Sequence, residues 1–322
     1  MAGITKWIDA SPNELVYDVA ERSIQTHLDT VHHFLPLAVQ QPDDDIEYVH
    51  QIRVWSRRAT SALRLYRDLL PWGKAARVKK HLSKIRRAAN DARDDDVLIL
   101  RLQQDVDDRG AARLLERVLK HRQQSQQPLL EMFERLDQGV KLSRRVNRLL
   151  KSTRQRAKTD KHGTTKFRKW ARKNLRPYVE EFFHRAKADL SDCEELHQLR
   201  ISGKKLRYTM ELLAGAFPER FTRQLAPKVK ALQDRLGEIN DYATAKSRYE
   251  RWIDESKKTS EADYLKGLMD EEQVLLEQRR AEFFEWFTPG RAQRLARAFD
   301  SIMVGRPVKR QRRAADMPDN SG

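Results

Sequence analysis

Residues 48–71 read YVHQIRVWSRRATSALRLYRDLLP, and residues 195–218 read ELHQLRISGKKLRYTMELLAGAFP. The two stretches align without a gap, with His50 opposite His197, an offset of 197 − 50 = 147 positions. The match continues at this offset as far as Asp94, and self-similarity at a fixed offset is typical of a duplicated structural unit. The sequence therefore predicts two similar halves.

Each stretch forms one cationic and one apolar face when it is placed on a helix at about 100° per residue. The cationic faces carry His50, Arg53, Arg57 and Arg64 in the first copy and His197, Arg200, Lys204 and Arg207 in the second, with Tyr208 nearby. The apolar faces carry Ile52, Ala59, Leu63, Tyr66 and Leu70, and Leu199, Leu206, Met210, Leu213 and Phe217. Like charges at this spacing repel by a few tenths of a kcal/mol, roughly, per pair. Folding does not reward such a row, whereas a chain of closely spaced phosphates does.

The rest of the chain also has helical patterning. The capping box from Ser11 to Glu14 predicts a helix over 12–40. Pro42 and the aspartates at 43–45 predict the start of a second helix that ends near Pro71. No alternating run rich in valine and isoleucine indicates a strand. We therefore predict an all-α protein.

The helix after Pro71 extends the basic surface. It carries Arg77, Lys80, Lys84 and Arg87 at helical spacing. The aligned residues of the second half are Gln224, Pro227, Ala231 and Asp234, and Lys228, Lys230 and Arg235 replace the lost charges only in part. We therefore expect the two halves to bind an anion unequally.

Composition sets the partner class. Lys and Arg number 64 against 47 Asp and Glu, so the net charge is 64 − 47 = +17. Such a field attracts nucleic acid, polyphosphate or an anionic membrane. The single cysteine, Cys193, excludes an intrachain disulfide, and no zinc-ligand spacing occurs. Neither a secretory signal nor a long apolar run is present. We expect a cytoplasmic protein that needs no metal or cofactor and is not bound to a membrane.

A polar link at 158–165 divides the chain. We predict a first half over 1–158, a second half over 159–303 and a disordered basic tail over 304–322. The KRQRR run in the tail leaves nuclear localisation open.

The repeated motifs resemble the CHAD family, the conserved histidine α-helical domains. The resemblance rests on VHQIRVWSRRATSALRLY at 49–66, LHQLRISGKKLRYTMELL at 196–213, RDDDV at 93–97 and LGEIND at 236–241. It extends over about 12–303. Trp55 and the pair Ser202-Gly203 depart from the small or aliphatic residues common at their positions.

The resemblance implies two four-helix bundles related by a pseudo-twofold, with basic faces that line a shared groove or pore. It implies non-catalytic binding of inorganic polyphosphate and association with polyphosphate granules and their proteins. The residues at matching motif positions, to which it extends a ligand role, are His50, Arg53, Arg57, Arg58, His197, Arg200, Lys204, Lys205 and Arg207.

Three alternatives stay open. A phosphohydrolase could hold a divalent metal on Asp91 and the aspartates at 94–96. At the repeat offset Tyr242 and Ala243 replace Asp95 and Asp96, which leaves Asp94 paired with Asp241, and we interpret these two as structural partners of a nearby Arg or Asn. A nucleic-acid-binding protein is compatible with the charge, since counterion release drives binding of any polyanion. However, no aromatic platform interleaves with the basic stripes, so we expect only weak, non-specific nucleic-acid binding. A scaffold could use the mixed-charge helix around 250–285.

Overall fold

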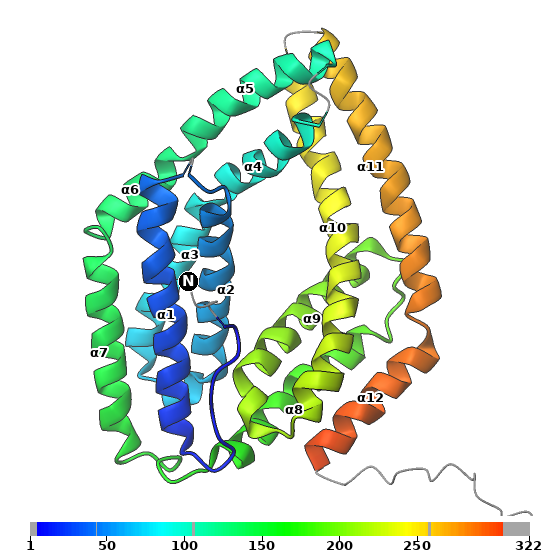
Figure 1. Ribbon diagram of the computed structural model, residues 1–322. Helices are drawn as coiled ribbons and strands as arrows, with labels where there is room; N and C mark the ends of the chain where they lie inside the picture. The colour runs from blue at the N-terminus through cyan, green and yellow to red at the C-terminus, as the bar shows by residue number, and fades with distance from the viewer. Residues whose placement is uncertain (1–4, 43, 105–106, 257–258, 305–322) are drawn as a thin grey trace, which may run out of the picture.

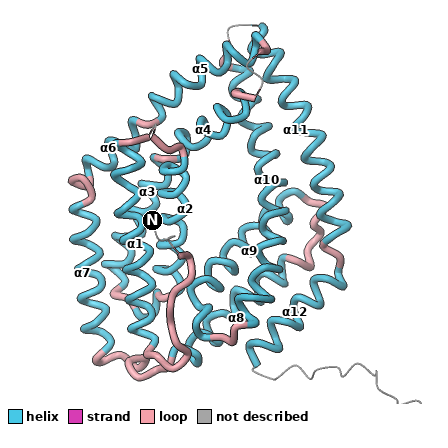
Figure 2. The backbone as a smooth tube through the Cα atoms, in the orientation of Figure 1, coloured by secondary structure: helices cyan, strands magenta, loops and turns pink. Residues whose placement is uncertain are grey.

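The computed structural model describes residues 5–42, 44–104, 107–256 and 259–304, and within these ranges the chain is all-helical (Figure 1). The elements in chain order are α1 (Val16–Gln40), α2 (Glu47–Leu65), η1 (Arg67–Leu69), α3 (Trp72–Ala88), α4 (Asn90–Leu102), α5 (Arg109–Ser125), α6 (Gln127–Arg135), α7 (Val140–Ala157), α8 (Phe167–Arg185), α9 (Cys193–Leu213), η2 (Ala214–Ala216), η3 (Phe221–Leu225), α10 (Ala226–Asp254), α11 (Thr259–Trp286) and α12 (Pro289–Val304). Figure 2 shows the connecting loops between them. The predicted all-α class is confirmed.

The helices form two groups that meet at two places (Figure 1). In the first group α1 packs on α2 and α7, and α3 packs on α2 and α7. In the second group α9 packs between α8 and α10, and α12 packs on α8. The groups meet where α2 lies against α9 and where α5 lies against α11. The backbone thus follows a ring in which the two repeated helices are neighbours.

The predicted apolar faces form the core. All five apolar residues of each repeated stretch are buried, from Ile52, which is 0% exposed, to Phe217, which is 7% exposed. The main cluster joins both groups, and Tyr66 stacks on Trp170 at 5.1 Å between ring centroids. A smaller cluster from α4, α5, α10 and α11 closes the far end of the ring. Burial of each large apolar side chain stabilises the fold by about 1.5–3 kcal/mol.

The first helix begins later than the capping box predicts. The Ser11 amide does donate to the Glu14 carboxylate, but α1 begins at Val16 rather than at 12. Backbone hydrogen bonds hold this segment against the start of α8: Val16 N donates to Thr165 O at 3.0 Å, and Phe167 N donates to Glu14 O at 2.8 Å. An extended segment cannot make these bonds and also be helical. The box therefore closes a turn that ties the two halves together.

Three further predictions concern boundaries. The second helix begins at Glu47, whose backbone N–H donates a hydrogen bond to the Asp45 carboxylate. The short helix η1 lies between the end of this helix and Pro71. The loop between α7 and α8 covers the predicted link at 158–165. The predicted tail beyond position 304, with its KRQRR run, lies outside the described residues. Asp43 also lies outside them. Within the described part, no helix is long and apolar enough to cross a membrane.

Candidate anion-binding site

The cationic faces of α2 and α9 meet at one point. Arg57 of α2 acts electrostatically on Arg53 of its own helix, on Arg86 of α3, and on Arg200 and Lys204 of α9. We call the group Arg53, Arg57, Arg86, Arg200, Lys204 and Arg207 the cationic cluster. Sequence periodicity placed five of these six on the two repeated helices. The fold brings the two rows together and adds Arg86.

The cluster perturbs its own titration. Burial, together with the charges of Arg200 and Arg57, lowers the pKa of Lys204 from 10.5 to about 8. Burial and neighbouring arginines likewise lower the pKa of Arg86. Burial raises the pKa of Tyr208, but the charges of Arg57 and Arg207 and hydrogen bonds from both outweigh it, so that the pKa falls. A shift of this kind means that the cations lack sufficient compensating negative charge.

One arginine of each repeated helix contacts an aspartate from another helix at the edge of the cluster. Arg53 contacts Asp94 at 3.5 Å and donates to the Asn90 carbonyl at 3.1 Å. Arg200 contacts Asp241 at 4.0 Å. Both pairs sit at the repeat offset, since 53 + 147 = 200 and 94 + 147 = 241. The interpretation of the two aspartates as structural partners of arginine is therefore confirmed.

Several donors inside the cluster are unused. The buried Nε atoms of Arg57, Arg200 and Arg207 have no hydrogen-bond partner among the described residues. Buried polar groups in proteins are nearly always paired, so each exception needs an explanation. These buried atoms add to the positive charge of the cluster that no carboxylate of a described residue balances at hydrogen-bond distance.

The structure does not bring Arg58 and Lys205 into the cluster. Arg58 pairs with the buried Glu211 at 3.2 Å and lies over the Trp55 ring at 4.7 Å. Lys205 pairs with Glu181 at 2.8 Å. These aligned cations each have a carboxylate partner on another helix, which gives them a structural role that the motif alone does not reveal.

The remaining predicted cations lie outside the cluster. Arg64, whose charge also acts on Arg86, is exposed at the end of α2. The exposed outer face of α3 carries Arg77, Lys80, Lys84 and Arg87, and only Arg87 also acts on Arg86. In the second half Lys228 is exposed, whereas Arg235 packs over the Trp286 ring at 4.2 Å. The stripe on α3 is thus a separate basic surface without an equal in the second half.

The two repeated histidines differ in environment. His50 is half-buried, and burial together with the charge of Arg93 lowers its pKa, so the ring is neutral at pH 7. His197 is exposed and lines a hollow of about 110 Å³ with Cys193 and Arg280. A neutral His50 can donate one hydrogen bond to an anion without adding charge.

The aspartates of the RDDDV motif are engaged in packing. Asp95 accepts from Ser125 at 2.7 Å and contacts His121 at 2.8 Å, and Asp96 pairs with Arg122. Burial raises the pKa of both aspartates, although the hydrogen bonds and charges of these partners act to lower it. Ser125 Oγ also lies 3.1 Å from His121 Nδ1, so the three side chains Asp95, His121 and Ser125 contact one another. Among the described residues, no group of three or more His, Cys, Asp and Glu is placed to hold a metal ion.

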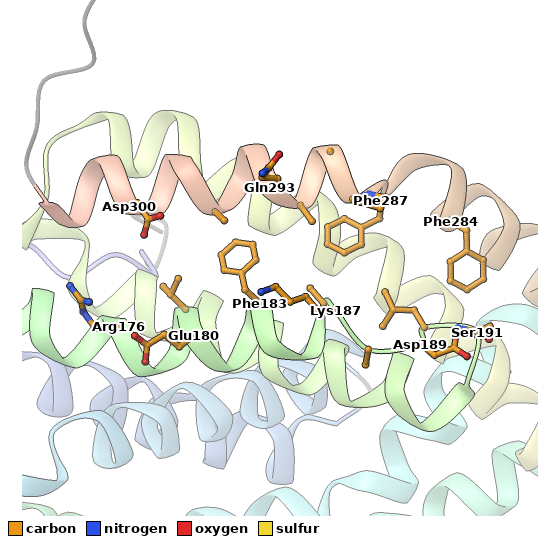
Figure 3. A pocket seen from close by; sticks show the side chains of 18 of the residues that line it. Arg176, Glu180, Phe183, Lys187, Asp189, Ser191, Phe284, Phe287, Gln293 and Asp300 are labelled. Atoms are coloured by element: carbon orange, nitrogen blue, oxygen red, sulfur yellow. Dashed lines mark hydrogen bonds between the residues drawn. The ribbon is translucent and has the colours of Figure 1, made fainter.

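A large hollow lies away from the cluster, between α8 and α12 (Figure 3). Its volume is about 1110 Å³, and Phe183 and Phe287 face into it. The charges on its rim are mixed, with Lys187 near Glu180 and Asp300. An apolar hollow with both signs of charge does not suit a polyanion.

Known proteins match this architecture. The family model for the CHAD domain matches residues 22–250, which include the whole cationic cluster. The crystal structure of the CHAD domain from the plant Ricinus communis is similar with a TM-score of 0.67 and 20% identity, covering 91% of this chain and 94% of that one. PptA from Streptomyces chartreusis is similar with a TM-score of 0.56 and 16% identity, covering 85% and 98%. At these identities the structures show the fold alone. No curated protein matches the chain in sequence.

Proposed function

The chain belongs to the CHAD domain family, and we propose that it binds inorganic polyphosphate at the cationic cluster without chemical turnover. The observation that carries the proposal is the position of Arg57 among cations from both repeated helices, where burial and charge lower the pKa of Lys204 to about 8. Partly buried, uncompensated positive charge costs the free protein stability. A chain of closely spaced phosphates supplies the missing negative charge and removes that cost, and the free energy recovered in this way strengthens its binding.

The donor set fits linked phosphates. Arginine donates to phosphate oxygens in a bidentate manner, and lysine supplies a point charge. Cations one helical turn apart, about 5.4 Å, can contact successive units of a chain. The cluster draws its cations from α2, α3 and α9, which offers contacts to several phosphates of one chain, so we propose selectivity for long chains.

We also propose that the two helix groups arose by duplication as two four-helix bundles around a pseudo-twofold. The pairs Arg53–Asp94 and Arg200–Asp241 support this, because they repeat at the offset of the sequence match. The bundles would be α1, α2, α3 and α7, and α8, α9, the first part of α10, and α12. The cluster then lies at the junction of the bundles, as a shared basic groove requires.

The absence of turnover is part of the proposal. Of the aspartates that a phosphohydrolase could use, Asp95 contacts Ser125 and His121, Asp96 pairs with Arg122, and Asp94 pairs with Arg53. A binder without chemistry acts by location, so we propose that polyphosphate granules and their proteins are its setting.

Calorimetric titration at near-physiological salt tests the proposal with long-chain polyphosphate, triphosphate and a charge-matched single-stranded RNA. We expect long-chain polyphosphate to bind about thirtyfold more tightly than RNA, or about 2 kcal/mol. Equal affinities would make the protein a general polyanion binder. Consumption of polyphosphate during the titration would establish an enzyme instead.

Two variants with equal charge change locate the site. The first replaces Arg53, Arg57, Arg200 and Lys204 by Ala, and the control replaces Arg77, Lys80, Lys84 and Arg87 on the exposed face of α3. Both remove four positive charges, so any difference between them reports position. We expect polyphosphate affinity to fall at least tenfold more in the first, with helicity retained in both. Equal losses would show that only net charge matters.

A further inference from the structure

A second cationic hollow lies apart from the cationic cluster. It has a volume of about 530 Å³ and is formed by η1, the start of α3, the end of α7, the α7–α8 loop and α8. We call it the Trp72 hollow; its lining is Arg67, Asp68, Leu70, Trp72, Arg156, Asp160, Lys161, His162 and Lys173. No residue of the cationic cluster contributes to it. Small-molecule sites typically have volumes of about 300–1,000 Å³.

Its charges are partly uncompensated. Arg156 pairs with Asp160 at 3.5 Å and donates to the Asp68 carbonyl at 3.2 Å. Lys161 and Lys173, by contrast, are exposed and form no ion pair with any described residue. Two free ammonium groups at one hollow attract an anion with more than one charge.

Trp72 gives the hollow a character that the cluster lacks. Its indole is 63% exposed at the first position of α3, and the Arg67 guanidinium lies 5.5 Å from the ring centroid. Exposure of so large an apolar group stabilises nothing in the fold. At the repeat offset, 72 + 147 = 219, the second half carries Glu219 in its place. The repeated architecture therefore does not require the ring.

An inorganic phosphate chain has no aromatic group that could stack on the Trp72 indole, whereas a nucleobase does. Base stacking on an aromatic ring next to Lys and Arg is the usual way in which proteins bind unpaired nucleotides. We propose that the Trp72 hollow binds a nucleotide, with its base against Trp72 and its phosphates at Lys161 and Lys173. The ligand is a free nucleoside phosphate or a nucleotide unit of a single strand, since both present the same base and phosphate.

The test uses the full chain with the four cluster cations replaced by Ala, because ATP phosphates also bind the cluster. Titrations with ATP, triphosphate and a short oligoadenylate are compared before and after Trp72→Ala. We expect ATP to bind roughly tenfold more weakly after the substitution, in line with the loss of one stacked base. We expect triphosphate binding to be unchanged by it. Trp72→Phe should restore ATP affinity, and Lys161→Gln with Lys173→Gln should weaken ATP and triphosphate alike.

The outcomes separate the two sources of the ligand. Trp72-dependent binding of ATP assigns a free nucleotide, and Trp72-dependent binding of oligoadenylate alone assigns a single strand. If neither ligand depends on Trp72, or if ATP and triphosphate lose the same affinity, the proposal is overturned. Since this background lacks four of the six cluster cations, a negative result concerns the Trp72 hollow and leaves the proposal of polyphosphate binding at the cluster unaffected.

Discussion

Lys204 allows the strain in the cationic cluster to be measured. Its pKa is about 8 against 10.5 when unperturbed, because burial and the charges of Arg200 and Arg57 disfavour the ammonium form. Each pKa unit corresponds to about 1.4 kcal/mol, so the charged side chain costs the folded state about 3 kcal/mol at pH 7. Lys204 is half-buried, and solvent screening reduces this to about 1–2 kcal/mol. We therefore expect Lys204→Met to raise the free energy of unfolding by that amount.

The sign of the pH dependence follows from linkage. Between pH 8 and 10.5 the unfolded chain retains the Lys204 proton that the folded protein has lost, so the contribution of this group to stability rises with pH. Below pH 8 the cost is complete. The gain from Lys204→Met should therefore be largest at pH 7 and vanish near pH 10.5. Urea denaturation followed by circular dichroism at both pH values measures it.

In Lys204→Met the affinity for polyphosphate should fall, whereas the free energy of unfolding should rise. Loss of one charge-assisted hydrogen bond, about 1.5 kcal/mol, should weaken affinity about tenfold in Lys204→Met. Lys205→Met is the matched control, because the neighbouring Lys205 already pairs with Glu181. It should destabilise the protein by less than about 1 kcal/mol and leave affinity unchanged. A destabilised Lys204→Met protein, or one with unchanged affinity, would refute the view that stability is lost here for binding.

At pH 8, titration in buffers of different ionisation enthalpy should show uptake of about half a proton on polyphosphate binding, because Lys204 is half-deprotonated in the free protein. Affinity should also fall between pH 7 and pH 9. Asp94→Asn with Asp241→Asn should raise affinity several-fold and steepen its salt dependence, since both arginine partners are released. Arg58→Ala should lower the free energy of unfolding by about 3 kcal/mol in urea denaturation, because Glu211 stays buried. Its polyphosphate affinity should be unchanged.

Helical periodicity explains what could be predicted. A residue's position on a helix decides which face it joins, so the apolar rows of α2 and α9 were assigned correctly from spacing alone. The same reasoning placed Arg57 and Lys204 on the cationic faces. The rows occur twice at a fixed offset in the sequence, and the division into two similar halves stays a prediction.

Contacts between distant helices explain what could not. Arg57 and Arg58 are neighbours in sequence, yet only Arg58 meets a buried carboxylate, Glu211, which lies 153 positions away. The sequence predicts a binding role for Arg87 but not for its neighbour Arg86. The packing of α3 on α2 nevertheless brings Arg86 within the electrostatic influence of Arg57. The start of α1 was misplaced because residues far along the chain, at 165–168, bond to it.

The packing of α2 against α9 explains why the cationic cluster lies where it does. Within one half, the cationic row meets its own aspartate, as Arg53 meets Asp94. Burial and the first-half arginines Arg57, Arg87 and Arg64 already lower the pKa of Arg86. The second row adds Arg200 and Lys204 of α9, whose pKa values are lowered by burial and by the charge of Arg57. Because α2 and α9 pack against each other, cations of the two repeated stretches come together in one cluster, and we propose that a polyphosphate chain contacts both helices there.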